Sequence, residues 1–248
     1  MKILGVIPAR YASTRFPGKP LVIIEGKSMI QRVYDQALKC DILSRVVVAT
    51  DNEEILNHVK LFGGNVLMTS RDHSSGTERC NEAVEILRNN GENYDYVINI
   101  QGDEPFIDPE QIKQLAQCFD NRQTLLATLI KKITKQEELS NPNIVKVTVD
   151  NKGLALLFSR SPIPFTRGTE QTLWVSATTY FKHIGIYGYQ SSILEILVTL
   201  PETPLEIAES LEQLRWLEHG FKIQTRVTQY ESVAIDAPGD LSKITNRT

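Results

Sequence analysis

The chain has 248 residues, a formal net charge of −3 at pH 7, 41% hydrophobic residues and 23% charged residues. This composition is typical of globular proteins, and the length suffices for one large domain. The negative charge argues against a nucleic-acid binder with a large basic face, so we expect no nucleic-acid partner. No apolar run reaches the ~18–20 residues of a membrane-spanning helix, so we expect no membrane insertion. Cys40, Cys80 and Cys118 are widely spaced, which predicts free thiols and a cytoplasmic location.

The first half of the chain alternates apolar runs, typical of buried strands, with segments of helical periodicity. The predicted strands cover residues 3–8, 45–50, 65–69 and 96–100. The predicted helices cover residues 29–38, 55–62 and 77–87, and another helix begins at Pro109. This order predicts an α/β fold with a mostly parallel sheet and helices on both faces. Ligands of such sheets bind at the carboxyl ends of the strands, so we expect the site in the loops that follow them.

The pattern changes at about residues 124–188, where strand-like runs dominate. These runs cover residues 125–130, 144–149, 154–158 and 184–189. The tripeptide Asn151-Lys152-Gly153 predicts a hairpin turn, so we expect an antiparallel elaboration used for substrate or dimer contacts. Residues 205–219 predict one helix that ends at Gly220, followed by a strand at 222–228. We therefore expect a single domain, 1–248, with a strand-rich elaboration at about 124–188.

The loop at residues 8–20 follows the first predicted strand and contains the three cations Arg10, Arg15 and Lys19 among small residues. Backbone amides in such a loop approach phosphate oxygens closely, and the cations can neutralise a triphosphate. The alternative is a solvated basic loop. Neither a P-loop nor a dinucleotide-binding glycine fingerprint is present in the sequence.

Two carboxylates are candidates for a magnesium site. Asp103 follows the predicted strand at 96–100, and Asp236 follows a short apolar run near the end of the chain. Mg²⁺ favours one or two carboxylates together with phosphate oxygens and water. The alternatives are structural, because Asp103 lies in a turn beside Gly102 and Asp236 could cap a last helix.

Other polar segments have both a functional and a structural interpretation. Ser75 or Thr77 could cap the N-terminus of a helix, and the exposed backbone amides at that end of the helix could also hold an anion. Arg160 suits recognition of a carboxylate, but a lone arginine is more often a surface residue. His183 lies on a glycine-rich strand, where a histidine is more often a core residue with its hydrogen bonds satisfied. The pair Glu212-Gln213 could reach a polyol, although a solvated helix face is the default.

Taken together, the motifs resemble those of the 3-deoxy-manno-octulosonate (Kdo) cytidylyltransferases, over nearly the whole chain. The motifs that carry the resemblance begin at Ile7, Val48, Ser75, Gln101, Phe158, His183 and Leu211, and read IPARYASTRFPGKP, VATD, SGTER, QGDEP, FSR, HIGIYGY and LEQLR. One local departure concerns the segment DAPGD at 236–240, where the family commonly has DTPED.

The resemblance implies a Rossmann-like nucleotidyltransferase fold, a cytoplasmic homodimer and transfer of CMP from CTP to Kdo with Mg²⁺, for lipopolysaccharide biosynthesis. It implies nucleotide contacts from Pro8, Ala9, Arg10, Arg15, Lys19, Arg71, Ser75, Gly76, Thr77 and Gln101. It implies sugar contacts from Gln101, Arg160, His183, Tyr187, Glu212 and Gln213. It implies metal ligation by Asp103 and Asp236, and catalysis by these two with Arg10, Arg15 and Lys19.

In the implied reaction a hydroxyl of the sugar acid attacks the α-phosphorus of CTP in line and expels pyrophosphate. Two alternatives stay open. The acceptor could be another 2-keto sugar acid, such as 8-amino-Kdo or a sialic acid. The chain could also be a nucleotide-binding regulator without activity, although the presence of Lys19, Asp103 and Asp236 together argues against this.

Overall fold

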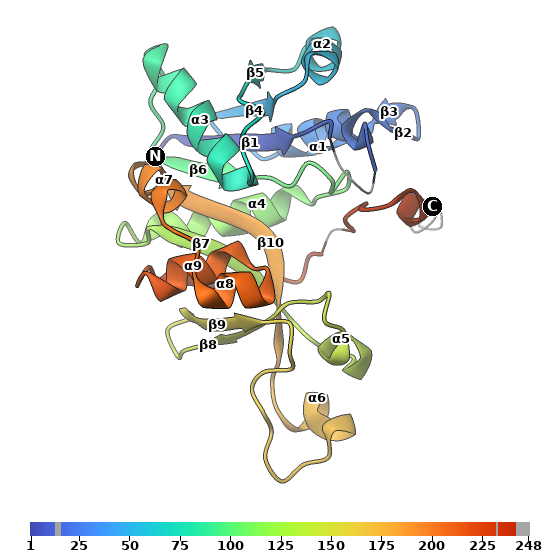
Figure 1. The fold of residues 1–248 in the computed structure, drawn as a ribbon, viewed down its shortest axis with the longest axis vertical. Coiled ribbons are helices and arrows are strands. Elements are labelled where there is room, and N and C mark those ends of the chain that lie inside the picture. Colours follow the sequence, from blue (N-terminus) through green and yellow to red (C-terminus); the bar gives the residue numbers. More distant parts are fainter. Residues whose placement is uncertain (13–15, 232, 242–248) are drawn as a thin grey trace.

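The computed structural model describes residues 1–12, 16–231 and 233–241, and is built around one large mixed sheet (Figure 1). Along its main path the strands follow the order β11 (Ile223–Val227), β7 (Leu126–Lys132), β10 (Phe181–Gln190), β6 (Tyr96–Asn99), β1 (Ile3–Ala9), β4 (Arg45–Thr50) and β5 (Val66–Met68). The four predicted strands of the first half are confirmed, and all pair in parallel.

The strand-rich segment after residue 124 is more closely integrated than the sequence suggested. Strand β7 runs parallel to β11, while β10 is antiparallel to both β6 and β7, so these two strands lie inside the main sheet. Only β8 (Lys146–Val149) and β9 (Ala155–Ser159) form an additional hairpin, which pairs with the first residues of β10. In Figure 1, long β10 runs from the main sheet down to this hairpin.

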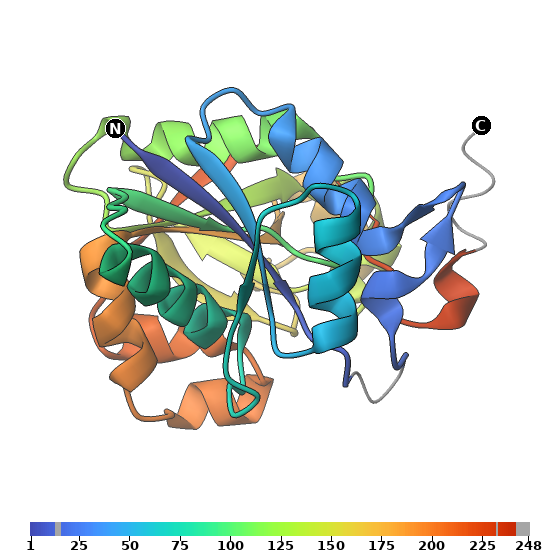
Figure 2. The same cartoon turned by 90° about the horizontal axis from the view of Figure 1, so that it is seen from above.

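Helices cover both faces of the sheet, as predicted (Figure 2). One face packs against α1 (Met29–Leu38), α2 (Glu53–Leu61) and α4 (Pro109–Ala116). The other packs against α3 (Gly76–Asn89), α7 (Ser191–Thr199) and α9 (Glu212–Glu218). Alternate residues of β1 supply the two cores: Ile3 and Ile7 join the first, and Leu4 and Val6 join the second.

The single helix predicted at 205–219 is wrong, because the segment forms two helices, α8 (Pro204–Glu209) and α9. Ser210 adopts a left-handed conformation (φ 51°) that ends α8, and Leu211 is the N-cap of α9. Glu206, rather than an apolar residue, is the buried side chain of α8, because it forms an ion pair with Arg215 (2.6 Å). Gly220 (φ 83°) ends α9 as predicted.

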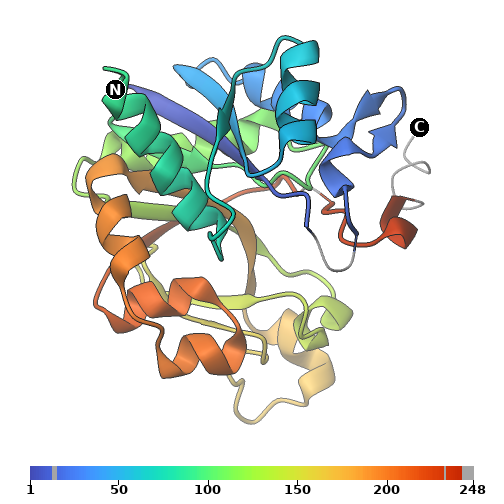
Figure 3. The same ribbon diagram turned by 45° about the horizontal axis from the view of Figure 1, so that its top comes forward.

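Several short elements complete the fold without having been predicted. They are β2 (Ile23–Ile24), β3 (Lys27–Ser28), α5 (Gln136–Ser140), α6 (Trp174–Ala177), α7 and the 3-10 helices η1 (Lys19–Leu21), η2 (Gln117–Asp120) and η3 (Gln171–Leu173). The 3-10 helix η4 (Pro238–Leu241) follows Asp236, where a last helix was considered. Figure 3 shows that the chain leaving β1 and the C-terminal segment with η4 lie on the same side of the sheet. Segments far apart in sequence therefore meet beyond the carboxyl end of β1.

No helix among the described residues is long and apolar enough to cross a membrane.

Candidate active site

A cavity of about 340 Å³ opens at the carboxyl ends of β1 and β6, where parallel sheets bind ligands. The predicted site residues that line it are Pro8, Ala9, Arg10, Lys19, Ser75, Gly76, Gln101, Asp103 and Asp236. Arg15 lies outside the described residues. Four segments of the chain thus converge on one cavity, and the cations and carboxylates predicted separately face the same space.

Lys19 lies between the two predicted metal ligands. Its Nζ is 2.8 Å from Oδ2 of Asp103 and 3.6 Å from Oδ1 of Asp236. Gly18, at φ 70°, turns the chain into η1 and donates its N–H to the carbonyl of Tyr11. The N–H of Ile235 donates to the carbonyl of Asp103 (2.9 Å), which holds the C-terminal segment against the β6 loop. The two carboxylates are therefore placed within reach of one cation.

This donor set fits a hard divalent cation, because two carboxylates face the cavity and oxygens of a bound phosphate could complete the coordination. Among the described residues, no group of three or more His, Cys, Asp or Glu side chains could hold a metal ion on its own. A metal here would depend on the substrate for the rest of its ligands, as Mg²⁺ does at other phosphate sites.

The first turn of α3 forms a second wall of the cavity. Ser75 is its N-cap, because the Ser75 hydroxyl accepts the N–H of Glu78 (3.2 Å), which settles the choice between Ser75 and Thr77. A Cβ at Gly76 would lie 3.3 Å from Nδ2 of Asn99, so a side chain here would have to displace Asn99 at the end of β6. The N-terminus of a helix this long attracts anions, which suits a phosphate group.

Two residues that sequence reasoning passed over also line the cavity, His73 and Arg79. Nε2 of His73 contacts Oε2 of Glu82, and the buried Arg79 bonds to Oδ2 of Asp51 (2.9 Å). The i, i+4 spacing of Glu78 and Glu82 on α3 was the signal that could have indicated partners for this histidine.

Arg71, a predicted nucleotide contact, does not line the cavity. Its Nε donates to the carbonyl of Asp51 (3.3 Å), and its side chain is exposed at the surface.

The predicted sugar-binding residues other than Gln101 do not line this cavity: His183 and Tyr187 lie on β10, Glu212 and Gln213 on α9, and Arg160 directly follows β9. The centroid of the His183 imidazole lies 5.1 Å from that of the Tyr187 ring, which in turn packs perpendicular to Trp216 at a centroid distance of 5.1 Å. The buried hydroxyl of Tyr187 has no hydrogen-bond partner within the described part of the chain. Buried polar atoms are normally paired, so this hydroxyl is a candidate contact for a bound ligand.

The remaining members of this group are held by the protein itself. The guanidinium of Arg160 donates to the carbonyls of Glu209 (2.7 Å, from Nε) and Pro142 (3.1 Å). Gln213 is buried, and the carboxylate of Glu212 accepts a hydrogen bond from Thr77 (2.8 Å). Arg160 would have to exchange its carbonyl partners in order to bind a sugar carboxylate.

Burial lowers the pKa of His183 to about 3, so its imidazole is neutral at neutral pH. The unfolded chain protonates this residue below about pH 6.5, whereas the folded protein does not, so stability falls as the pH decreases from 6.5 towards 3. Allowing for the partial exposure of the side chain, we expect a loss of about 1 kcal/mol between pH 6.5 and 5.

Urea unfolding of the native protein and of His183→Asn at both pH values measures this contribution. His219→Asn, at an exposed histidine, is the control. We expect the pH-dependent loss to shrink only in His183→Asn, and an unchanged loss in that variant would contradict the assignment.

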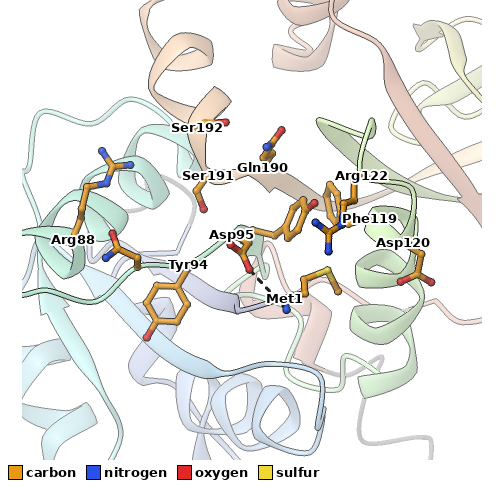
Figure 4. A pocket seen from close by; sticks show the side chains of 12 residues that line it. Met1, Arg88, Tyr94, Asp95, Phe119, Asp120, Arg122, Gln190, Ser191 and Ser192 are labelled. Atoms are coloured by element: carbon orange, nitrogen blue, oxygen red, sulfur yellow. Dashed lines mark ion pairs between the residues drawn. The ribbon is translucent and has the colours of Figure 1, made fainter.

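A larger cavity of about 650 Å³ lies away from all the predicted site residues (Figure 4). It is lined by residues at the amino ends of β1 and β6 and at the start of α7, among them Met1, Asp95 and Ser191. The N-terminal ammonium of Met1 is 3.9 Å from Asp95, an ion pair that Figure 4 marks. Size therefore does not identify the candidate site, whereas the convergence of cations and carboxylates does.

Comparison with known proteins shows the family of the chain. A family model described as cytidylyltransferase matches residues 4–223. The chain is 51% identical over 247 residues to a 3-deoxy-manno-octulosonate cytidylyltransferase of Parabacteroides distasonis, covering 98% of this chain and 96% of the relative. It is 50% identical over 244 residues to one of Thermodesulfovibrio yellowstonii, covering 97% and 96%.

Solved structures give the same result. A CMP:2-keto-3-deoxy-manno-octonic acid synthetase complexed with CTP superposes with a TM-score of 0.90 at 42% identity, covering 99% of this chain and 98% of that one. A 4-diphosphocytidyl-2C-methyl-D-erythritol synthase of Anaerococcus prevotii shares the fold alone, with a TM-score of 0.62 at 12% identity, covering 99% and 97%. The predicted nucleotidyltransferase fold is thereby confirmed, and the chain belongs to the 3-deoxy-manno-octulosonate cytidylyltransferase family.

Proposed function

We propose that this chain transfers CMP from CTP to Kdo, giving CMP-Kdo and pyrophosphate for lipopolysaccharide biosynthesis. The observation that carries this proposal is the position of Lys19 between Asp103 and Asp236, at the mouth of a cavity that Arg10 and the first turn of α3 also line. Cations, carboxylates and helix amides together suit a nucleoside triphosphate. Family membership identifies CTP and Kdo as its substrates.

The chain's own residues account for binding and charge neutralisation at the triphosphate. Arg10 and Lys19 face the phosphates, and the amides at Ser75 and Gly76 add hydrogen-bond donors at the α3 N-terminus. As pyrophosphate departs, negative charge builds up on it, and fixed cations lower the free energy of that transition state. The site requires no covalent intermediate, since positioning and electrostatics dominate such transfers.

We propose Mg²⁺ as the cofactor, held by Asp103 and Asp236 together with phosphate oxygens. When bound, this ion would neutralise phosphate charge and polarise the attacking hydroxyl. The carboxylates also fix Lys19 in the absence of substrate, because each lies within salt-bridge distance of its Nζ.

The sugar acid would occupy the side of the cavity towards β10 and α9. The unpartnered hydroxyl of Tyr187 and the neutral imidazole of His183 offer hydrogen bonds to sugar hydroxyls. Arg160 suits the carboxylate of the acid. These contacts remain predictions from the family resemblance, supported by the clustering of the rings of His183 and Tyr187.

Release of pyrophosphate from CTP and Mg²⁺ in the presence of Kdo tests the function directly. Parallel reactions with 8-amino-Kdo and with a sialic acid test the alternative acceptors. We expect the fastest release with Kdo. CTP binding without release with any of the three acids would instead favour a regulator, and faster release with another acid would reassign the acceptor.

We further propose a cytoplasmic homodimer whose interface includes the hairpin of β8 and β9 and the segment from residue 160 to residue 180. Several apolar side chains here are exposed, including Leu156 (61%), Phe165 (75%) and Leu173 (54%). Figure 1 shows this part extending away from the main sheet. A cluster of large exposed apolar side chains is typical of an interface between protein chains.

The cytoplasmic location is supported by the three cysteines, all of which are free thiols.

Phe165→Glu should shift the protein from two chains to one in analytical ultracentrifugation, because a charge in an apolar interface is desolvated without a partner. Ile207→Glu, at a side chain that is 64% exposed on α8, is the matched control and should leave the mass unchanged. A native protein that sediments as one chain, or a Phe165→Glu variant that still sediments as two, would contradict the proposed interface.

A further inference from the structure

The first residue of α9 connects the sugar side of the site to the nucleotide side. Helix α9 starts at Glu212 and is anchored on the sheet by Trp216, whose ring lies nearly perpendicular to those of Tyr187 and Tyr189, at centroid distances of 5.1 Å and 5.9 Å. Leu214 and Trp216 are both fully buried. The backbone that carries Glu212 is therefore held firmly by apolar packing.

The carboxylate of Glu212 reaches across to the first turn of α3. Its Oε2 accepts a hydrogen bond of 2.8 Å from the hydroxyl of Thr77, a residue only 2% exposed and 135 positions earlier in the chain. The hydroxyl of Tyr189 lies 3.4 Å from the same Thr77 oxygen. Burial raises the pKa of Glu212, while hydrogen bonds from Thr77 and Ser75 oppose that shift. Thr77 is thus fixed between two buried elements, α9 and β10.

Thr77 directly follows Ser75, the N-cap of α3, and Gly76, its first residue, both of which line the nucleotide cavity. Moving Thr77 would move their backbone amides, because all three belong to one helical turn. A carboxylate close to the N-terminus of α3 also complements the partial positive charge of that end.

We propose that Glu212 is a positioning residue for CTP, which acts through Thr77 to hold the Ser75–Thr77 turn in its binding geometry. This inference rests on the proposed function, since it assigns the cavity to CTP. It differs from the role that the family resemblance implies for Glu212, which is contact with the sugar. It also predicts that CTP affinity depends on Glu212 when no sugar acid is present.

Isothermal titration of CTP with Mg²⁺ in the absence of any sugar acid tests this inference. Glu212→Ala should weaken CTP about tenfold, since it leaves the buried Thr77 hydroxyl without its charged partner. Glu212→Gln should remain close to the native affinity, because its amide oxygen still accepts from Thr77. Glu218→Ala, at the other end of α9, is the matched control and should bind CTP like the native protein.

A double-mutant cycle with Thr77→Val separates this role from general damage to the fold. Thr77→Val should weaken CTP to a similar extent, and the double variant should lose little more, because both changes remove the same contact. Thr77→Val alone tests the contact if Glu212→Ala fails to fold. Native affinity in either folded single variant, or additive losses, would overturn the inference. Failure of the native protein to bind CTP would overturn the proposed function instead.

Discussion

Asp103→Asn is expected to lower turnover of CTP and Kdo by about two to four orders of magnitude while the protein stays folded. The amide keeps the shape of the carboxylate but removes its charge. Its side chain would then bind Lys19 and the proposed divalent cation less strongly, and both are proposed to neutralise the triphosphate. Steady-state pyrophosphate release measures turnover, and circular dichroism with thermal unfolding checks the fold.

Asp41→Asn, the same substitution at an exposed carboxylate, is the control and should retain native turnover. Raising the Mg²⁺ concentration should partly restore the Asp103→Asn variant, because a weakened site fills at higher concentration. Near-native turnover of Asp103→Asn at low Mg²⁺ would contradict both the metal assignment and the catalytic role of this residue.

Lys19→Ala is expected to reduce kcat/KM for CTP by about two to three orders of magnitude. The variant loses the ammonium that lies 2.8 Å from Asp103 and 3.6 Å from Asp236, and two carboxylates would then face the phosphates without it. We expect most of the loss in kcat, because the departing pyrophosphate carries more negative charge in the transition state than it does in bound CTP.

Lys27→Ala is the control for Lys19, because it removes an equally flexible cation from an exposed pair with Asp35. Lys19→Arg should recover only part of the activity, since a planar guanidinium does not replace a compact ammonium between two carboxylates. A loss confined to KM, with kcat unchanged, would show that Lys19 contributes to ground-state binding of CTP rather than to departure of pyrophosphate.

Sequence reasoning identified the residues changed in these variants one at a time. The fold shows why the predicted nucleotide-binding residues converge on one cavity. Arg10 and Lys19 follow β1, and Gln101 and Asp103 follow β6, which is the adjacent parallel strand. Parallel neighbours place their carboxyl ends at one edge, so the order of strands and helices alone predicts that these loops meet. Ser75 and Gly76 belong to the same group, because α3 packs on β1 and β6.

The sugar half was less accessible to prediction. Glu212 was predicted to face a polyol or solvent, and only the packing of Trp216 on β10 shows that its carboxylate contacts Thr77. Likewise, Asp236 reaches Lys19 only because the N–H of Ile235 donates to the carbonyl of Asp103. Such contacts join residues more than a hundred positions apart, and no local periodicity encodes them.

The sequence by itself determined the alternation of strands and helices, the residues at the strand ends and the family, because these depend on local periodicity and on short motifs. Tertiary structure alone decided that β7 and β10 lie inside the main sheet, since strand pairing depends on long-range register rather than on apolar pattern. It also decided that residues 205–219 break into two helices. The left-handed conformation of Ser210 turns the chain between α8 and α9, so that Trp216 of α9 is buried. Glu206 of α8 then pairs with Arg215 of α9. The helix propensities of the individual residues could not predict the burial of Trp216.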